Sequence, residues 1–141
     1  MLGLFFVYNI LMRLILLFIF LSFNLLAEDS WTLIHKDDQN KSSFHIKLGD
    51  FKKIDNKVRL WVMESYDEPQ PPEKYAYHSL KSLVQADCSS TKIRFMAYSI
   101  YKSNNASGTA IYSKGQSSEW FEANPNTVNR AYLDIACKES N

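Results

Sequence analysis

The sequence predicts an α+β domain: an antiparallel sheet of about six strands, with one C-terminal α-helix packed on it and tethered by one disulfide. Three observations support this fold class. Several short runs alternate apolar and polar residues, which is the period of a half-buried strand. The last apolar run instead repeats at helical spacing. Cys88 and Cys137 are the only cysteines of the chain.

The N-terminus carries the features of a secretory signal peptide over residues 1–27. Arg13 is followed by eight consecutive apolar residues, and the segment ends at Ala27, before the acidic pair Glu28-Asp29. A basic start, a short apolar core and a small residue at the cleavage point are typical of exported proteins. We therefore expect cleavage after Ala27.

The exported part is expected to be a single domain over residues 28–141. One alternative is an uncleaved anchor helix, because residues 2–27 are long enough to span a bilayer. Translation from Met12 is a further alternative, since Met12-Arg13 would itself begin a compact signal peptide. No cysteine follows the apolar segment, so the sequence shows no site for lipid attachment.

The predicted strands are rich in β-branched and aromatic residues. In the run from Val58 to Met63 both faces carry bulky side chains, so we expect this strand to be central and covered on both sides. The stretch Lys102 to Gly108 contains the polar residues of a hairpin turn, which makes the middle of the chain an antiparallel meander. In chain order the runs are residues 31–36, 43–48, 58–63, 79–88, 92–101, 109–113 and 118–122.

The segment Tyr66 to Tyr75 contains three prolines within four positions. Prolines at this density favour an extended polyproline II path. In an exported protein, a stiff exposed connection between strands is the preferred interpretation, and a proline-rich recognition motif is the alternative.

The C-terminal helix is predicted to begin with Asn124 as its cap and Pro125 in its first turn. Its apolar residues then fall on one face, which should pack on the sheet. The residues of this face are Val128, Ala131, Tyr132, Ile135 and Ala136.

An even number of cysteines in an exported chain predicts a disulfide between Cys88 and Cys137. This bond would close a loop of about 50 residues, for which loss of chain entropy in the unfolded state is worth about 4 kcal/mol. Because Cys88 follows a predicted strand and Cys137 lies in the last helical turn, the bond would fasten the helix to the sheet.

Charge and composition exclude several function classes. Without Arg13 the exported part carries fifteen basic and fifteen acidic groups, a balance that disfavours a nucleic-acid partner. The four glycines are scattered and form no phosphate-binding loop, so we expect no cofactor.

The histidines predict neither a metal site nor a catalytic site. His35, His45 and His78 lie on predicted strands without a carboxylate at ligand spacing, although His35 and His45 could meet across a hairpin. Ser79, Ser82 and Asp87 near His78 match no nucleophile motif. We therefore expect no enzyme and no metal.

Aromatic residues make up 14% of the chain, and most are expected in the core or in cross-strand pairs. Trp61, Tyr98 and Tyr112 are the candidate binding surface, because tyrosine and tryptophan dominate binding hot spots.

A set of aromatic residues and the two cysteines resembles the bacterial surface-adhesin protein E family. The resemblance spans about residues 31–138. It is carried by Trp31, Val58-Arg59-Leu60-Trp61-Val62, Ser79-Leu80-Lys81-Ser82-Leu83 leading into Asp87-Cys88, Lys92-Ile93-Arg94-Phe95, Trp120, Pro125 and the closing Ala136-Cys137.

This resemblance implies an antiparallel sheet with a C-terminal helix tethered by a disulfide, in a Gram-negative envelope protein. Cys88 and Cys137 match the tethering pair. It also implies binding of host matrix and serum proteins such as vitronectin and laminin, which the namesake of the family binds. The namesake is a lipoprotein, and this chain departs from it by having no cysteine at the cleavage site.

The sequence thus predicts an exported, non-catalytic binding module in the periplasm or on the surface of a Gram-negative bacterium. The expected partner is a macromolecule, with a host extracellular-matrix or serum protein as the specific hypothesis and a homodimer left open. The alternative is a soluble periplasmic enzyme or small-ligand-binding protein, which would need a polar pocket.

Overall fold

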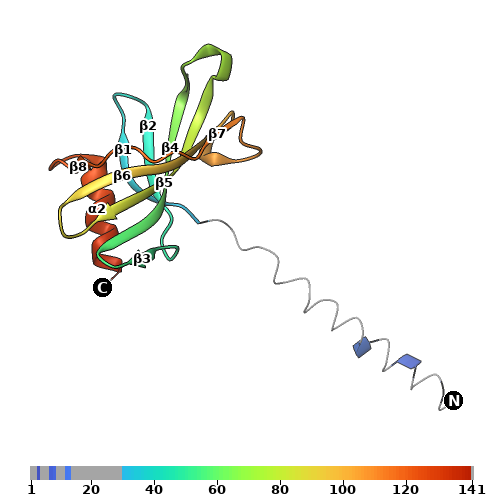
Figure 1. Cartoon of the computed structure of the whole chain (residues 1–141). Helices are drawn as coiled ribbons and strands as arrows, with labels where there is room; N and C mark the ends of the chain where they lie inside the picture. The colour runs from blue at the N-terminus through green and yellow to red at the C-terminus, as the bar shows by residue number, and fades with distance from the viewer. Residues whose placement is uncertain (1–2, 4–6, 9–11, 14–29, 141) are drawn as a thin grey trace.

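The structure is a computed structural model that describes residues 3, 7–8, 12–13 and 30–140 (Figure 1). Most of the predicted signal peptide, residues 1–27, lies outside the described residues, so this assignment stays a prediction. No helix among the described residues is long and apolar enough to cross a membrane.

The described domain is an antiparallel sheet with one helix, which confirms the predicted fold class (Figure 1). Six strands follow the order β1-β2-β4-β5-β6-β7, while β3 pairs with β4 and β8 pairs with β6. The elements are β1 (Thr32–Asp37), β2 (Ser42–Ile46), β3 (Lys52–Ile54), β4 (Lys57–Gln70), β5 (Tyr77–Asp87), β6 (Lys92–Tyr101), β7 (Tyr112–Lys114), β8 (Phe121–Glu122) and α2 (Val128–Glu139), with short 3-10 turns η2 (Glu73–Tyr75) and η3 (Asn104–Ala106).

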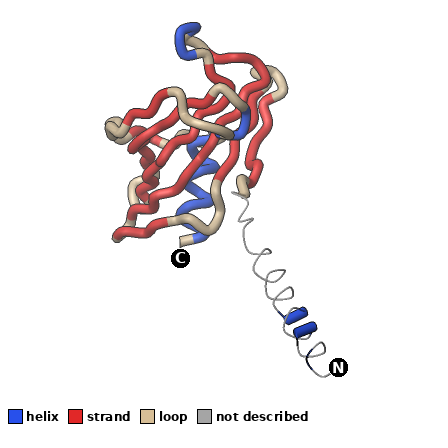
Figure 2. The backbone as a smooth tube through the Cα atoms, turned by 90° about the vertical axis from the view of Figure 1, so that its right-hand side faces the viewer, coloured by secondary structure: helices blue, strands red, loops and turns tan. Residues whose placement is uncertain are grey.

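The helix covers one face of the sheet, which we call the inner face (Figure 2). The registers Leu60↔Val84 and Val84↔Phe95 place these three side chains on that face, because alternate residues of a strand share a face. The completely buried Tyr132 of α2 packs against them. The core of the domain therefore lies between α2 and strands β2, β4, β5 and β6.

The opposite, outer face is closed at one end by the β6–β7 connection. The Ser79 hydroxyl donates to the Ser103 carbonyl and accepts from the Ala106 N–H at 2.9 Å. The Ser65 hydroxyl accepts from the Asn105 N–H at 3.2 Å. These bonds explain how two serines can be buried on the face that carries no helix.

Strand β4 is central, as predicted, but longer than the sequence pattern indicated. It runs through Pro69 to Gln70, and Gln70 pairs with Tyr77 after an irregular stretch that begins beyond Ser65. The first half of the proline segment, residues 66–70, is therefore part of a strand, and its second half, with the cis bond between Pro71 and Pro72, forms the turn. The strand continues to Gln70 because β4 still pairs with β5 there, although its residues beyond Ser65 no longer alternate between apolar and polar.

Helix α2 begins three residues later than the predicted cap and first turn at Asn124 and Pro125. Asn126 adopts the left-handed conformation, with φ of 63°, and this interrupts any helix that starts before it. The Thr127 hydroxyl caps the helix instead, accepting from the Arg130 N–H at 3.2 Å. The same hydroxyl donates to the Asn124 carbonyl at 2.7 Å.

The disulfide between Cys88 and Cys137 joins the end of β5 to the last turns of α2, as predicted. The strands, α2, both cysteines and the hydrophobic core all lie within residues 32–139.

Candidate binding groove

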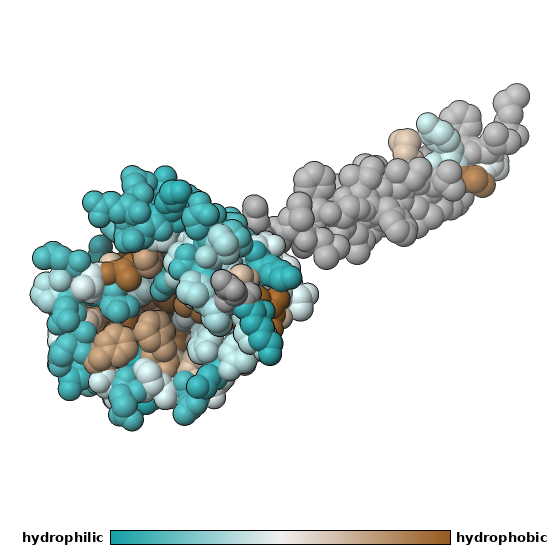
Figure 3. Space-filling view, turned by 90° about the horizontal axis from the view of Figure 1, so that it is seen from above, coloured by the Kyte–Doolittle hydropathy of each residue, from teal (hydrophilic) through white to brown (hydrophobic). Residues whose placement is uncertain are grey.

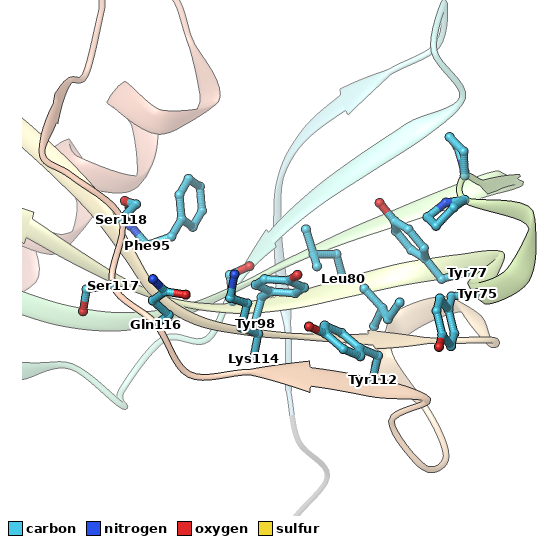
Figure 4. A pocket seen from close by; sticks show the side chains of 14 residues that line it. Tyr75, Tyr77, Leu80, Phe95, Tyr98, Tyr112, Lys114, Gln116, Ser117 and Ser118 are labelled. Atoms are coloured by element: carbon cyan, nitrogen blue, oxygen red, sulfur yellow. Dashed lines mark hydrogen bonds between the residues drawn. The ribbon is translucent and has the colours of Figure 1, made fainter.

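The sheet extends past the N-terminal end of α2. There its inner face forms an open groove of about 850 Å³, which we call the aromatic groove (Figure 4). Seen from above, brown apolar side chains gather in a hollow among teal hydrophilic ones (Figure 3). The lining residues are Pro71, Pro72, Tyr75, Tyr77, Leu80, Ser82, Phe95, Tyr98, Ile100, Tyr112, Lys114, Gln116, Ser117 and Ser118.

The floor of the groove comes from β5 and β6. The registers Leu80↔Ile100 and Ser82↔Tyr98 put these four residues on the same face as the core. The pairing of β5 with β6 shifts by one residue at a β-bulge between Leu83 and Val84. Because of this shift, Tyr98 and Ile100 point to the inner face, as Phe95 does. The floor is thus a rigid continuation of the core surface.

One wall of the groove is β7 with the segment that follows it. Ser118 fastens this segment to β6, because its N–H donates to the Phe95 carbonyl at 2.8 Å and its hydroxyl accepts from the Phe95 N–H at 3.1 Å. Tyr112 and Lys114 face the groove from β7, opposite Ile100 and Tyr98.

The other wall is the tip of the β4–β5 hairpin. Tyr75 of this wall lies 6.1 Å from Tyr112, and Tyr98 lies 6.0 Å from Tyr112, measured between ring centroids. Three phenol rings from β6, β7 and η2 therefore meet across the groove (Figure 4). The Lys74 ammonium stands 5.4 Å from the Tyr75 ring centroid.

A half-buried carboxyl lies near the groove. Glu64 of β4 is the cross-strand neighbour of Leu80, and its carboxylate accepts a hydrogen bond from the Tyr66 hydroxyl. Burial raises the pKa of Glu64, against the opposing effect of this hydrogen bond. The buried Tyr132 hydroxyl has no hydrogen-bond partner among the described residues.

Two tyrosine hydroxyls of the groove, those of Tyr77 and Tyr98, stay neutral at physiological pH. Burial raises the pKa of Tyr77 and Tyr98, and nearby Glu64 adds to the effect on Tyr77. A neutral phenol can both donate and accept a hydrogen bond while its ring offers apolar area. The groove is therefore suited to holding a partly apolar ligand segment and orienting its polar groups.

The structure unites two of the three residues predicted as a binding surface. Tyr98 and Tyr112 lie side by side in the aromatic groove. Trp61 lies on the outer face, because its neighbour Leu60 points into the core. Tyr75 and Tyr77 were not predicted as binding residues. Their place in the groove depends on the pairing of Gln70 with Tyr77, which brings the tip of the β4–β5 hairpin over the sheet.

The histidines do not meet across the β1–β2 hairpin. His35 pairs with Phe44, and its ring lies 5.9 Å from the Phe44 ring, whereas His45 pairs with Leu33 and Met63 on the other face. The described part of the chain contains no group of three or more histidine, cysteine, aspartate or glutamate residues that could hold a metal ion.

Sequence comparison with protein families gives one result. The model of the family described as Surface-adhesin protein E matches residues 31–138, which include all the strands and nearly the whole of α2. No curated protein is significantly similar to the chain.

Solved structures of protein E from Haemophilus influenzae have the same fold. One has a TM-score of 0.60 at 15% sequence identity and covers 80% of this chain and 86% of its own. A second crystal form has a TM-score of 0.57 at 15% identity, with 67% and 80% covered. Protein E from non-typeable Haemophilus influenzae has a TM-score of 0.53 at 13% identity, with 75% of each chain covered.

Proposed function

The chain belongs to the surface-adhesin protein E family, and we propose that it binds a host extracellular-matrix or serum protein through the aromatic groove. The observation that carries this proposal is the meeting of three phenol rings over an apolar floor beside the end of α2. Aromatic side chains in such a setting dominate binding energies, because they bury a large area with few rotatable bonds.

The groove supports non-catalytic binding of a protein segment. Its floor is fixed by strand pairing, so little order has to be gained when a partner binds. Tyr112 is 43% exposed, and its ring can therefore be covered by a ligand.

The proposed location is the periplasm or the cell surface of a Gram-negative bacterium, after export and cleavage near Glu28. The motif of Ala27 followed by Glu28-Asp29 supports this cleavage point. Intact-mass measurement of the protein recovered from the envelope tests it. A species that retains residues 12–27 would instead indicate an uncleaved anchor.

The binding test uses oxidised residues 28–141 immobilised on a surface, with vitronectin and laminin as soluble partners. We expect saturable binding that Tyr112→Ala weakens about ten-fold or more, as is usual for an aromatic hot spot. Tyr101→Ala is the matched control, because Tyr101 pairs with the buried Ser79 on the outer face.

Two results would contradict the proposal. Equal losses of affinity for Tyr112→Ala and Tyr101→Ala would show that the host protein does not bind through the groove. Absence of binding to both host proteins, together with turnover or saturable uptake of a small molecule, would favour the periplasmic enzyme or small-ligand protein, whose ligand a cavity of this size could hold.

A further inference from the structure

We propose that the outer face of the sheet docks on an anionic phospholipid surface, so that the aromatic groove points away from the membrane. The contact consists of four cations, Lys52, Arg59, Lys81 and Arg94, together with the three tryptophans of the chain. We call this set the cation–tryptophan face. It is separate from the groove, and the inference does not depend on the proposed host ligand.

Three of the cations lie in one row across the sheet. Lys52 of β3 pairs with Arg59 of β4, Arg59 pairs with Gln85 of β5, and Gln85 pairs with Arg94 of β6. At about 4.8 Å between strands, Lys52 and Arg94 stand about 14 Å apart. The row therefore presents three positive charges along a line on one face.

The charges of this row are not neutralised within the domain. In the next row, Lys57 pairs with Asp87 and Lys92 pairs with Glu122, both at 3.7 Å. Among the described residues, no carboxylate forms an ion pair with any of the four cations of the face. Anionic head groups would supply the missing counter-charges.

All three tryptophan rings lie against cations of this face. The Lys81 ammonium is 4.9 Å from the Trp61 centroid and 5.7 Å from the Trp31 centroid. The Arg94 guanidinium is 4.5 Å from the Trp120 centroid, and it also donates two hydrogen bonds to the Gln85 side-chain oxygen. Indole rings beside cations are the side chains that prefer the boundary between head groups and hydrocarbon.

Exposed aliphatic residues distinguish a membrane from a soluble polyanion as the partner. Leu33 and Ile54 belong to the outer face by their pairing with His45 and Lys57, and they are 54% and 51% exposed. A hydrated polysaccharide offers no apolar region in which these side chains could be buried. Insertion of the same side chains into a bilayer removes apolar surface from water and therefore favours binding.

The chain also enters the domain on this face. Trp31 follows the apolar N-terminal segment by a few residues and contacts Lys81. If that segment remains in a membrane as an anchor, the cation–tryptophan face is the part of the domain beside it. If it is cleaved, the cation–tryptophan face itself remains available for attachment to the membrane.

The test uses oxidised residues 28–141 with vesicles of phosphatidylglycerol and phosphatidylcholine in equal parts, and with vesicles of phosphatidylcholine alone. We expect co-sedimentation with the anionic vesicles only. A blue shift of tryptophan fluorescence should accompany it, because all the tryptophans lie on the docking face. High salt should release the protein.

Charge variants locate the contact. Lys52→Gln/Lys81→Gln is expected to lower the apparent binding constant about 25-fold, since each cation near an anionic surface contributes about five-fold. Lys52→Arg/Lys81→Arg, which keeps the charge, should bind as the wild type does. The matched control is Lys74→Gln/Lys138→Gln, which removes two exposed lysines from η2 and α2.

Three results would overturn the proposal. The first is equal binding to both kinds of vesicle, and the second is an equal loss in the control pair. The third is binding of a soluble sulfated polysaccharide without vesicle binding, which would assign the face to a soluble polyanion. Retained host-protein binding by Lys52→Gln/Lys81→Gln, and retained vesicle binding by Tyr112→Ala, would show that the two proposals stand or fall separately.

Discussion

Glu64 illustrates how a single residue couples the core to the groove. It occupies a strand position whose neighbours Val62 and Leu60 are buried, and its carboxylate has the Tyr66 hydroxyl as donor. An acid at this position interrupts the alternation of apolar and polar residues in β4. The alternation does not indicate which residue donates a hydrogen bond to its carboxylate. The sequence could not have shown that Tyr66 hydrogen-bonds this carboxylate, or that Tyr132 of α2 lies near enough to feel its charge, because tertiary packing brings α2 there.

Glu64→Gln is expected to stabilise the domain more at high pH than at low pH. Because burial raises the folded-state pKa of Glu64 above its ordinary value of 4.5, the protonated carboxyl is favoured by folding. That contribution is fully present below pH 4.5 and is lost as the pH rises through the folded pKa. Glutamine remains uncharged throughout, so the difference in free energy of unfolding should grow with pH.

Urea unfolding of the wild type and Glu64→Gln between pH 4 and pH 8 measures this difference. Glu68→Gln is the control, because Glu68 lies exposed on the same strand. Parallel stability profiles for the wild type and Glu64→Gln would contradict the expected cost of burying the charge.

At the scale of elements, strands with clear alternation could be predicted and those defined by pairing could not. The run at 92–101 coincides with β6, whereas β3 has three exposed residues and no apolar pattern, so only its pairing with β4 reveals it. Of the predicted runs at 109–113 and 118–122, only residues 112–113 and 121–122 lie in strands, β7 and β8, because few residues of these runs find a partner on β6. The helix start was displaced by the left-handed Asn126, whose conformation no periodicity indicates.

Thr127→Ala should destabilise the domain by about 1 kcal/mol, the usual cost of losing a helix cap. The Thr127 hydroxyl both accepts from the Arg130 N–H and donates to the Asn124 carbonyl. Asn124→Ala is the matched comparison, because Asn124 takes part only through its backbone carbonyl. Thermal unfolding of both variants decides the point, and a larger loss for Asn124→Ala would restore Asn124 as the cap.

Cys137→Ser should loosen α2 more than the sheet. The lost cross-link closes a loop of about 50 residues, worth about 4 kcal/mol in chain entropy. The strands keep their ladder hydrogen bonds, whereas a helix of 12 residues depends on its packing for stability. Hydrogen exchange should show early loss of protection over residues 128–138, and uniform loss across all strands would show that α2 does not open separately.

At the scale of the whole molecule, the sheet separates two surfaces of different chemistry. The inner face carries α2 and the aromatic groove, while the outer face carries the cation–tryptophan face. The sequence predicted the sheet and the helix from short-range patterns, and the disulfide from the even number of cysteines in an exported chain. It could not assign Trp61 and Tyr98 to opposite faces, because that depends on the cross-strand registers and on the bulge in β5 and β6.

This separation predicts two different salt dependences in one protein. Lys114 is the single charged residue among those that line the groove, and a net charge near zero makes long-range steering weak. Binding of vitronectin or laminin should therefore change little between low and high ionic strength. Docking on anionic vesicles relies on four cations that form no ion pair with a carboxylate among the described residues, so it should weaken strongly with added salt.

Measuring both interactions on the same preparation, at 50 mM and 500 mM salt, checks this contrast. A change confined to the vesicles is the expected result, because screening acts on exposed charges and leaves apolar contact with tyrosine rings nearly unchanged. Equal salt sensitivity of the two interactions would mean that host proteins also use the cations of the outer face. Lys52→Gln/Lys81→Gln would then weaken both interactions together.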